Sequence, residues 1–566
     1  MYLLRSGRAF VIIKKIEKQE GKVLKKIKIS KEEIATFFKN NGRTIAKKTS
    51  LTLLVLFMIT AICLSIYSIA AYSNLRITVD LADEKQTVQG FGASMAWTFQ
   101  RMGEEGTDEV KERSVEMLYG DSGLRLNIAR FNIGGGSADS NLDNVVPYCN
   151  DWFDPDRRAE SFFMAENYLD ASDEELFAAF ADESNYDFTR DAGALEMLDM
   201  ALATGNIDRI VFFANSPHYL MTYSGTCTGA EVQQNNLKEE FYGAYCDYLL
   251  IIVDNLVENH FSGLENMPEV VISPVNEPQW DWGGDGSSQE GCHFDPEPLA
   301  AFYDVFFDKL EAFNTANGTS YECDVLESGN YKFYIDRKDI KEYLEAMSKY
   351  DYFDRIESVS AHSYGADDSK THRQKYQDYI DKNYPGLGIS ITEYCEMEGG
   401  RFDTIESGLL LGNVISRDLT MLSATDWSWW LAVSPCDYND GLVYWDVLDD
   451  GTQKLSVLKR YYVMGQFSRY IEKGDVRVGA TCSDLTGWAG LDYSAYKRAD
   501  GTVVVVIINN SKSSKNVTVG GLSDYTKAVE VRTTSEAQTG WDEKETAWTG
   551  KVSLPAQSVT TYVLTK

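Results

Sequence analysis

Short apolar runs alternate with longer amphipathic stretches between about residues 85 and 455 of this 566-residue chain. The runs are rich in β-branched and aromatic residues and are bounded by turn-forming residues, a pattern typical of buried β-strands. Helical patterns such as LAAFYDVFFDKLEAF, residues 299–313, lie between them. Eight runs are expected to be strands: 87–94, 124–131, 208–215, 269–276, 324–328, 356–364, 388–394 and 424–430.

Eight strands that alternate with helices over about 370 residues predict a (β/α)₈ TIM barrel, enlarged by loop insertions. A doubly wound open sheet is the alternative, but such a sheet normally carries a glycine-rich phosphate loop after its first strand. The sequence contains neither GxGxxG nor GxxxxGK. We therefore assign residues 89–465 to an α/β barrel.

Beyond residue 470 the pattern changes to period-two or all-apolar strands that are separated by polar turns. These strands predict an antiparallel β-sandwich over residues 466–566, attached to the barrel as a side domain. The early segment 73–88, which contains LRITVDLAD, is expected to join this sandwich. No linker rich in Pro, Gly or Ser separates the two parts, so we expect them to pack as one unit.

The amino-terminal 72 residues have a different character. Residues 1–50 carry 14 Lys and Arg against four Asp and Glu, whereas residues 51–72 carry no charge. Twenty-odd apolar residues suffice to cross a bilayer, and a positive flank stays in the cytoplasm. A buried core helix is the alternative, but the lopsided flanking charge disfavours it. We expect an extracellular protein, with residues 51–72 acting as a transmembrane signal anchor or as a signal peptide. Ser68 and Ala70 fit the small −3 and −1 positions of a signal-peptide cleavage site.

Composition narrows the classes of partner. The 86 acidic residues outnumber the 54 basic ones and give a formal charge of −32, so no nucleic-acid partner is expected. With only five His and no CxxC pair, the sequence also predicts no metal centre and no other cofactor. Eight of the nine Cys follow the apolar segment, which permits disulfides without fixing their pairing.

Two predicted strand ends carry carboxylates suited to glycosidic bond hydrolysis. In a barrel of this type the reacting groups stand at the carboxyl ends of strands. The segment SPVNEPQW places Asn276 and Glu277 after the fourth strand, and ITEYCE places Glu393 at the end of the seventh. Such a pair supplies one acid to protonate the leaving oxygen and one carboxylate to attack the anomeric carbon. Competing acids near these strand ends are Glu327, Glu396 and Glu398.

From about residue 86 to residue 566 the chain resembles glycoside hydrolase family 30. The resemblance rests on GFGASMAWTFQ, RFNIGGGS, ANSPHYLM, SPVNEPQW, SAHSYG and ITEYCE. The ending VSLPAQSVTTYVL is similar to the closing strands of that family's side sandwich. The segment QEGCHF, residues 289–294, resembles the branch that contains endo-β-1,6-galactanases.

The resemblance implies a retaining β-glycosidase in which Glu277 is the general acid/base and Glu393 is the nucleophile. Asn276 would hydrogen-bond the 2-hydroxyl of the sugar, and Arg130 would hold the nucleophile ionised. A structural ion pair is the alternative for Arg130, and core packing is an equal alternative for Trp97. Further expected substrate contacts are His362, Tyr364, Trp97, Trp430 and Asn215.

The implied substrate is a β-linked polysaccharide or oligosaccharide, with endo-β-1,6-galactanase activity as the first interpretation. A β-1,6-glucanase, a xylanase and a glucosylceramidase-type enzyme are alternatives within the family. The third strand is followed by ANSPHYLMTYSG where many members have Trp-Ser-Pro-Pro, and the acid motif continues with Gln279, Trp280, Asp281 and Trp282. A non-catalytic carbohydrate-binding surface protein is the alternative from another class, but a pure binder does not need both glutamates.

Overall fold

Eight parallel strands form the centre of the larger domain, and all but the shortest of them are almost entirely buried. The computed structural model describes residues 75–139, 157–229, 234–283, 289–331, 340–367, 369–484 and 487–566. All of them belong to the unit Asn74–Lys566, so the barrel and the sandwich form one unit. The barrel strands are β2 (Gly90–Ser94), β3 (Ile128–Ile133), β4 (Arg209–Ala214), β5 (Glu269–Ser273), β6 (Glu322–Cys323), β7 (Ser358–His362), β8 (Gly388–Glu393) and β9 (Asp426–Ser434).

The strands pair in parallel from β2 to β6, and β7, β8, β9 and β2 also pair in parallel, in that order. Between β6 and β7 the ring closes through a parallel bridge of Ser328 with Ala361. At this junction Ser360 N–H donates to Val325 O at 2.8 Å, and His362 N–H donates to Ser328 O at 2.7 Å. The predicted (β/α)₈ barrel is confirmed.

The strand predicted at 324–328 differs from the regular β6, which covers only Glu322–Cys323. Leu326 has a φ of 82° and Glu327 a φ of 41°, both in the left-handed region that interrupts a regular strand. The segment still bonds to β5 and β7, but its pleat is broken. This interruption places the Glu327 side chain inside the barrel, where it is completely buried.

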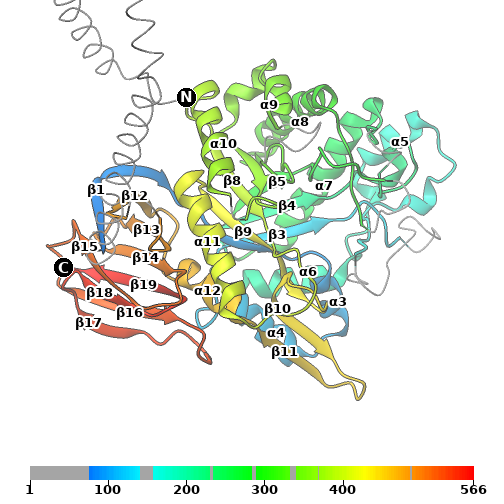
Figure 1. Ribbon diagram of the computed structural model, residues 1–566. Coiled ribbons are helices and arrows are strands. Elements are labelled where there is room, and N and C mark those ends of the chain that lie inside the picture. Colours follow the sequence, from blue (N-terminus) through cyan, green and yellow to red (C-terminus); the bar gives the residue numbers. More distant parts are fainter. Residues whose placement is uncertain are drawn as a thin grey trace, which may run out of the picture. The chain divides into compact units, whose positions relative to one another are not determined.

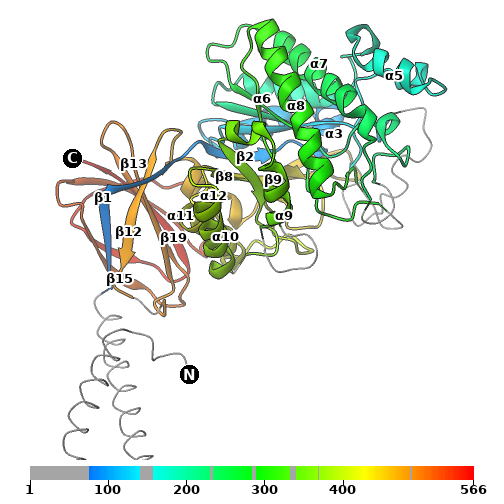
Figure 2. The same ribbon diagram turned by 90° about the horizontal axis from the view of Figure 1, so that it is seen from above.

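Helices cover the outside of the barrel strands (Figures 1 and 2). Several begin at a hydroxyl side chain that accepts a backbone N–H, including Thr107 before α4 and Ser369 before α10. The helical pattern at 299–313 lies within α8. The helices are α3 (Thr98–Glu105), α4 (Asp108–Leu118), α5 (Asp173–Phe180), α6 (Ala192–Leu202), α7 (Tyr242–His260), α8 (Pro296–Asn317), α9 (Ile340–Met347), α10 (Lys370–Asn383), α11 (Ile405–Met421) and α12 (Lys459–Ser468).

Two strands that the sequence analysis did not anticipate extend the barrel sheet beyond β9. Strand β10 (Gly441–Val447) pairs in parallel with β9, and β11 (Gln453–Val457) pairs with β10 in an antiparallel hairpin. Residue 465, where the barrel was expected to end, falls inside α12, and the next strand begins at Val476.

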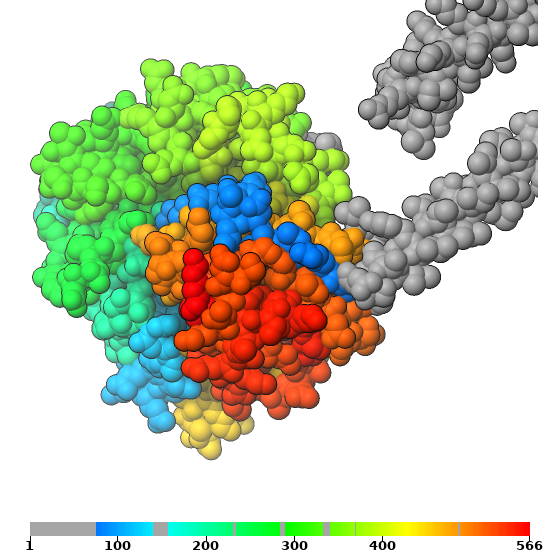
Figure 3. Space-filling model, turned by 90° about the vertical axis from the view of Figure 1, so that its left-hand side faces the viewer, coloured from blue at the N-terminus to red at the C-terminus, as the bar shows by residue number. Residues whose placement is uncertain are grey.

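The side domain is a nine-stranded sheet in the order β17-β16-β19-β14-β13-β12-β1-β15-β18. Strand β1 enters it from the start of the described chain and pairs antiparallel with β12 and parallel with β15. Figures 1 and 3 show this blue segment among the orange and red ones. The strands are β1 (Leu75–Thr87), β12 (Val476–Cys482), β13 (Leu491–Lys497), β14 (Val503–Asn509), β15 (Lys515–Gly520), β16 (Lys527–Thr533), β17 (Lys544–Ala547), β18 (Lys551–Leu554) and β19 (Ser558–Thr565).

The continuous apolar run VVVVIIN of β14 is buried on both faces, which explains why it lacks period-two alternation. Val505 and Ile507 belong to the core inside the sandwich. Val506 and Ile508 on the opposite face join the barrel core, which also contains Val463 of α12. The sandwich therefore packs directly on the barrel, as the missing linker predicted.

The predicted basic segment 1–50 and the predicted apolar segment 51–72 lie outside the described residues. Among the residues that are described, no helix combines the length and the apolar character needed to cross a membrane. The interpretation of residues 51–72 therefore stays a prediction from the sequence.

Six cysteines of the described barrel and sandwich are free thiols: Cys227, Cys246, Cys292, Cys323, Cys395 and Cys482. The disulfides that export permits are therefore not formed by these six residues. Burial raises the pKa of the Cys227 thiol well above its usual value, so the thiol stays protonated and donates to Gly135 O at 2.9 Å. Packing and hydrogen bonds, rather than cross-links, hold these segments together.

Candidate active site

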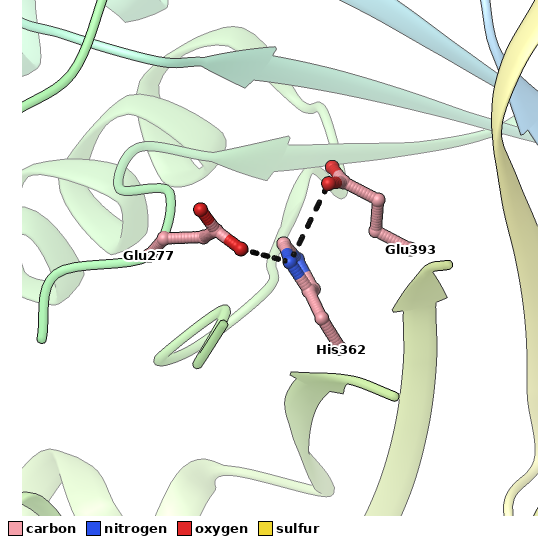
Figure 4. Close-up of side chains that lie close together, drawn as sticks. All are labelled: Glu277, His362 and Glu393. Carbon is pink, nitrogen blue, oxygen red and sulfur yellow. Dashed lines mark hydrogen bonds and ion pairs between the residues drawn. The ribbon is translucent and has the colours of Figure 1, made fainter. Parts of the chain in front are cut away.

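Glu277, His362 and Glu393 meet at the carboxyl ends of three barrel strands (Figure 4). Glu277 follows β5, His362 ends β7 and Glu393 ends β8. The imidazole lies between the two carboxylates: its Nδ1 is 2.9 Å from Glu277 Oε1 and 3.6 Å from Glu393 Oε1. One oxygen of each carboxylate and this nitrogen all lie within 4.8 Å of one another. The two glutamates selected from the sequence therefore share one site.

The backbone of Glu277 is held in a left-handed conformation, with a φ of 48°. Such a conformation is uncommon for a residue other than glycine and persists only where the surroundings hold it. Glu277 N–H donates to Glu327 O at 2.9 Å, and Trp282 Nε1–H donates to Glu277 O at 3.0 Å. These two bonds fix the backbone on both sides of the residue and so determine where its carboxylate lies.

Two side chains donate hydrogen bonds to the carboxylate of Glu393. Arg130, on β3, donates from Nη1 to Oε2 at 3.0 Å, and Tyr364 donates from its hydroxyl to Oε1 at 3.0 Å. Burial raises the pKa of Tyr364 well above its usual value, so its hydroxyl keeps the proton that it donates. The Arg130 guanidinium also lies over the Phe213 ring, 4.4 Å from its centroid.

The pKa of Glu393 is raised above the usual carboxyl value, chiefly because the side chain is buried. The charge of Glu277 raises it further, whereas the charges of His362 and Arg130 lower it. Arg130 therefore acts in the direction that the resemblance implied, but burial outweighs it.

A third carboxylate, Glu327, lies beneath His362 and is completely buried. Its Oε2 is 2.9 Å from His362 Nε2, and its Oε1 accepts from Ser273 Oγ at 3.1 Å. Burial would raise its pKa, but Arg130 and the hydrogen bond from His362 outweigh burial and lower the pKa to about 2. Glu327 is therefore ionised and has no access to a substrate.

Burial would likewise lower the pKa of His362, but the surrounding carboxylates raise it to about 10. At neutral pH the ring is an imidazolium that donates from Nδ1 to Glu277 and from Nε2 to Glu327. The sequence analysis treated His362 as a binding residue at most; the structure places it between carboxylates. Oxygen and nitrogen donors at this spacing would suit a cation, but a protonated Nδ1 has no lone pair to bind one.

This protonation has a measurable consequence for stability. The pKa of His362 is about 10 in the folded state, against roughly 6.5 for a free imidazole. Between about pH 6.5 and pH 10 the folded chain therefore binds more protons than the unfolded chain. The stability that the charged His362 contributes is complete below about pH 6.5 and is lost as the pH rises towards 10. The difference in free energy of unfolding between wild type and His362→Gln, measured with denaturant, is expected to shrink from pH 7 to pH 10. A constant difference would contradict the assignment.

The other two competing acids have different surroundings. Glu396 accepts from Ser407 Oγ at 2.6 Å and lies 3.5 Å from Arg460 Nη2. Glu398 is exposed. Glu277 and Glu393 therefore remain as the pair whose carboxylates face each other.

Two buried amides, which follow β4 and β5, have polar atoms without a hydrogen-bond partner among the described residues. Asn276 precedes Glu277 and is 4% exposed, and its Oδ1 accepts no hydrogen bond. Asn215 follows β4 and is 1% exposed, and neither its Oδ1 nor its Nδ2 is bonded. Buried amide groups normally have partners, so these atoms are suited to bind a polar ligand.

The two predicted aromatic contacts differ in their access to solvent. Trp97 is completely buried, whereas Trp430 on β9 is 8% exposed. Their rings meet edge to face, with centroids 5.1 Å apart and planes at 85°. Trp97 therefore packs against Trp430, and its role as a substrate contact or a core residue stays a prediction.

A buried carboxylate that the sequence analysis did not select lies in the segment QEGCHF. Glu290 accepts hydrogen bonds from Gly135 N–H at 3.0 Å and from Ser137 N–H at 3.1 Å. Burial raises its pKa to about 7. Glu290 thus ties this segment to the loop after β3. In the sequence it lies between Gln289 and Gly291, a context that shows no catalytic or binding motif.

A (β/α)₈ barrel with two facing glutamates at the carboxyl ends of β5 and β8 has the architecture of a glycosidase. The profile of O-glycosyl hydrolase family 30 matches residues 74–444, and the profile of the family 30 β-sandwich domain matches residues 474–562. The chain therefore belongs to glycoside hydrolase family 30 and is an O-glycosyl hydrolase.

An endo-β-1,6-galactanase from Hypocrea rufa is 24% identical over 424 residues, which cover 73% of this chain and 78% of that protein. Among solved structures, a conserved exported protein from Bacteroides fragilis superimposes with a TM-score of 0.72 at 24% identity and covers 86% of this chain and 100% of its own. The catalytic domain of family 30 xylanase C from Talaromyces cellulolyticus gives a TM-score of 0.62 at 18% identity, covering 87% and 100%. At these identities the two structures show the fold alone.

Proposed function

We propose that this enzyme is a retaining β-glycosidase in which Glu277 is the general acid/base and Glu393 the nucleophile. The observation that carries the proposal is the proximity of the two carboxylates, each with an oxygen within 4.8 Å of the other. Retaining glycosidases have carboxyl groups roughly 5–5.5 Å apart, and inverting enzymes leave about 6.5–9.5 Å for a water molecule. The spacing here supports direct attack by one carboxylate.

The hydrogen-bond donors distinguish the two roles. Arg130 and Tyr364 both donate to Glu393, which stabilises negative charge on it before the reaction. Glu277 accepts from His362 through Oε1, so a proton held on its other oxygen can face the leaving group.

The proposed reaction has two displacements. First, Glu393 attacks the anomeric carbon, the glycosidic bond breaks, and the departing oxygen takes the proton of Glu277. A covalent glycosyl ester on Glu393 results. Next, Glu277 takes a proton from a water molecule, the water oxygen attacks the anomeric carbon, and the ester bond breaks. The product keeps the β-configuration.

The remaining predicted site residues are proposed as substrate contacts. The unbonded Oδ1 of Asn276 beside the acid supports a hydrogen bond to the sugar 2-hydroxyl. The unbonded amide of Asn215 supports a second contact from β4, and the partly exposed ring of Trp430 supports stacking. Tyr364 and His362 would reach the sugar only through the carboxylates, and Trp97 would act through Trp430.

Retention of configuration is a prediction of its own. Hydrolysis of a β-linked oligosaccharide followed by proton NMR in the first minutes is expected to show the β-anomer before mutarotation. The reason is that two inversions at the same carbon restore its configuration. An initial α-anomer would mean that water attacks directly and that Glu393 acts as a base.

The proposed substrate is β-1,6-linked galactan, such as the side chains of arabinogalactan proteins. The segment QEGCHF and the tryptophans after Glu277 support it, as does the similarity to the Hypocrea rufa galactanase. Residues 73–566 incubated with a panel of linkage-defined β-glycans should release sugars fastest from β-1,6-galactan. Faster cleavage of β-1,6-glucan or xylan would reject the substrate and keep the reaction, and binding without release would reject the enzyme.

We also infer that the chain is exported, with residues 51–72 directing it. The support is the uncharged length of this segment and the basic residues before it. Whether the segment is retained is decided by the amino-terminal sequence of the exported protein. Recovery of the whole chain from the cytoplasm would reject export.

A further inference from the structure

The two tryptophans that follow Glu277 differ in what they contact. Trp280 is 36% exposed, which is high for so large an apolar side chain. Trp282 is less exposed and donates from Nε1 to Glu277 O. The proposed hydrolysis assigns no role to the exposed indole.

Trp282 is built into the loop. A Cβ placed on Gly291 would lie 2.2 Å from the Trp282 ring, so this ring packs against a position that only glycine can occupy. A Cβ on Gly229 would lie 2.5 Å from the backbone of Trp282. These close approaches, with the bond to Glu277 O, make Trp282 a support for the acid/base.

Trp280 is directed towards the carboxyl group of Glu277. A Cβ placed on Gly329 would lie 2.1 Å from Trp280 Nε1 and 2.7 Å from Glu277 Oε1, so both side chains converge on this glycine. The backbone of Trp280 is also fixed, because its N–H donates to Glu277 O at 3.1 Å and its carbonyl lies 2.9 Å from His293 Nδ1. The indole is therefore held beside the carboxylate while part of it faces solvent.

The side of the acid/base on which the indole lies follows from the strand order. Trp280 comes from the loop after β5, and Gly329 comes from the segment between β6 and β7. The nucleophile stands on β8, and it attacks the anomeric carbon from the face opposite the leaving oxygen. The leaving group is therefore bordered by side chains that lie beside the proton donor and belong to strands that do not carry the nucleophile.

We propose that the Trp280 indole forms the stacking wall of the subsite that binds the sugar on the leaving-group side of the scissile bond. This inference rests on the proposed roles of Glu277 and Glu393. The ligand of this subsite is a pyranose ring with an apolar face. A galactose unit offers such a face through the C–H groups on one side of its ring. An aromatic ring provides a flat apolar surface for such a face, while the sugar hydroxyls stay in water.

The test compares a substrate that fills this subsite with one that leaves it empty. β-1,6-Galactotriose places a sugar beyond the scissile bond, whereas β-1,6-galactobiosyl fluoride has only a fluoride ion as its leaving group. Trp280→Ala is expected to lower the ratio of kcat/KM for the triose to kcat/KM for the fluoride at least about tenfold. Trp280→Phe should restore most of that ratio, because it keeps an aromatic face.

A matched control removes an exposed tryptophan far along the chain. Trp488 lies between β12 and β13 of the sandwich and is 73% exposed. Trp488→Ala is expected to change neither rate. If the glycan panel identifies another β-linked substrate, the same comparison uses its trisaccharide and the fluoride of its disaccharide.

A second measurement uses the subsite as an acceptor site. Hydrolysis of the fluoride with added methyl β-galactoside is expected to give a transfer product, because the acceptor sugar binds where the leaving sugar was. Trp280→Ala should lower the fraction of transfer product while fluoride release continues. This readout separates sugar binding from a general loss of the acid/base.

Each outcome decides the proposal. An unchanged ratio and an unchanged transfer fraction in Trp280→Ala would overturn it. A lowered ratio with an unchanged transfer fraction would also overturn it and assign Trp280 to holding Glu277, because a weakened acid slows the triose but not the fluoride. That is the effect expected of Gly329→Ala. If the wild type cleaves neither substrate class, the proposed roles of the glutamates fail as well.

Discussion

Glu393→Gln is expected to abolish turnover on every substrate, because an amide can neither attack the anomeric carbon nor carry the glycosyl ester. Arg130 and Tyr364 donate to different oxygens of Glu393, and the single amide oxygen can still accept from one of them, so the variant should stay folded. Initial rates on a natural β-glycan and on an aryl β-glycoside measure the loss. Added azide should not restore a retained product.

Glu277→Gln should be equally severe on natural glycans, whose sugar leaving groups need a proton. An activated aryl group leaves without one, so the first displacement should survive in this variant. The second displacement should then be slow, because no base deprotonates water, and a glycosyl-enzyme should accumulate in intact-mass spectra. Azide needs no deprotonation and is expected to restore turnover with retained configuration.

The matched control for both variants is Glu398→Gln, which changes an exposed acid close to Glu393 in the sequence. Its rates should equal those of the wild type. Wild-type activity in either Glu277→Gln or Glu393→Gln, without azide, would move the role to another acid. Glu327 is excluded from that position by its complete burial, so Glu396 would be tested next.

Glu327→Gln is expected to lower kcat by about 100-fold with a smaller change in KM, because misplacing a catalytic group can cost that much. Glu327 touches no substrate, but it bonds His362, which in turn bonds the acid/base. Removing its charge takes away one of the carboxylates that raise the pKa of His362 to about 10. The pKa of His362 should therefore fall, and the basic limb of the kcat profile should move to lower pH.

The measurement is the pH dependence of kcat for wild type and Glu327→Gln. Glu396→Gln is the control, because Glu396 bonds Ser407 instead of His362, and its profile should not move. A Glu327→Gln variant with an unchanged basic limb would mean that His362 does not act through its charge. Loss of activity with an unchanged profile would assign Glu327 to stability alone.

The sequence predicted the barrel because its signals are local. Apolar runs bounded by turn residues define strands whatever the rest of the chain does, and helical periodicity between them leaves few topologies. The same local rule placed Glu277 and Glu393 at strand ends, where parallel strands direct residues to one face. The interruption in the strand at 324–328 escaped this reasoning, because the left-handed conformations of Leu326 and Glu327 depend on neighbouring strands.

What the sequence could not determine is which side chains are buried together. The bonds that join Glu277, His362 and Glu327 connect residues up to 85 positions apart, and Arg130 reaches Glu393 across 263 positions. Burial and these partners decide that Glu327 is an ionised support, although its sequence context resembles that of a catalytic acid. Protonation depends on the field of all neighbouring charges in a space without water, and only the tertiary structure creates that space.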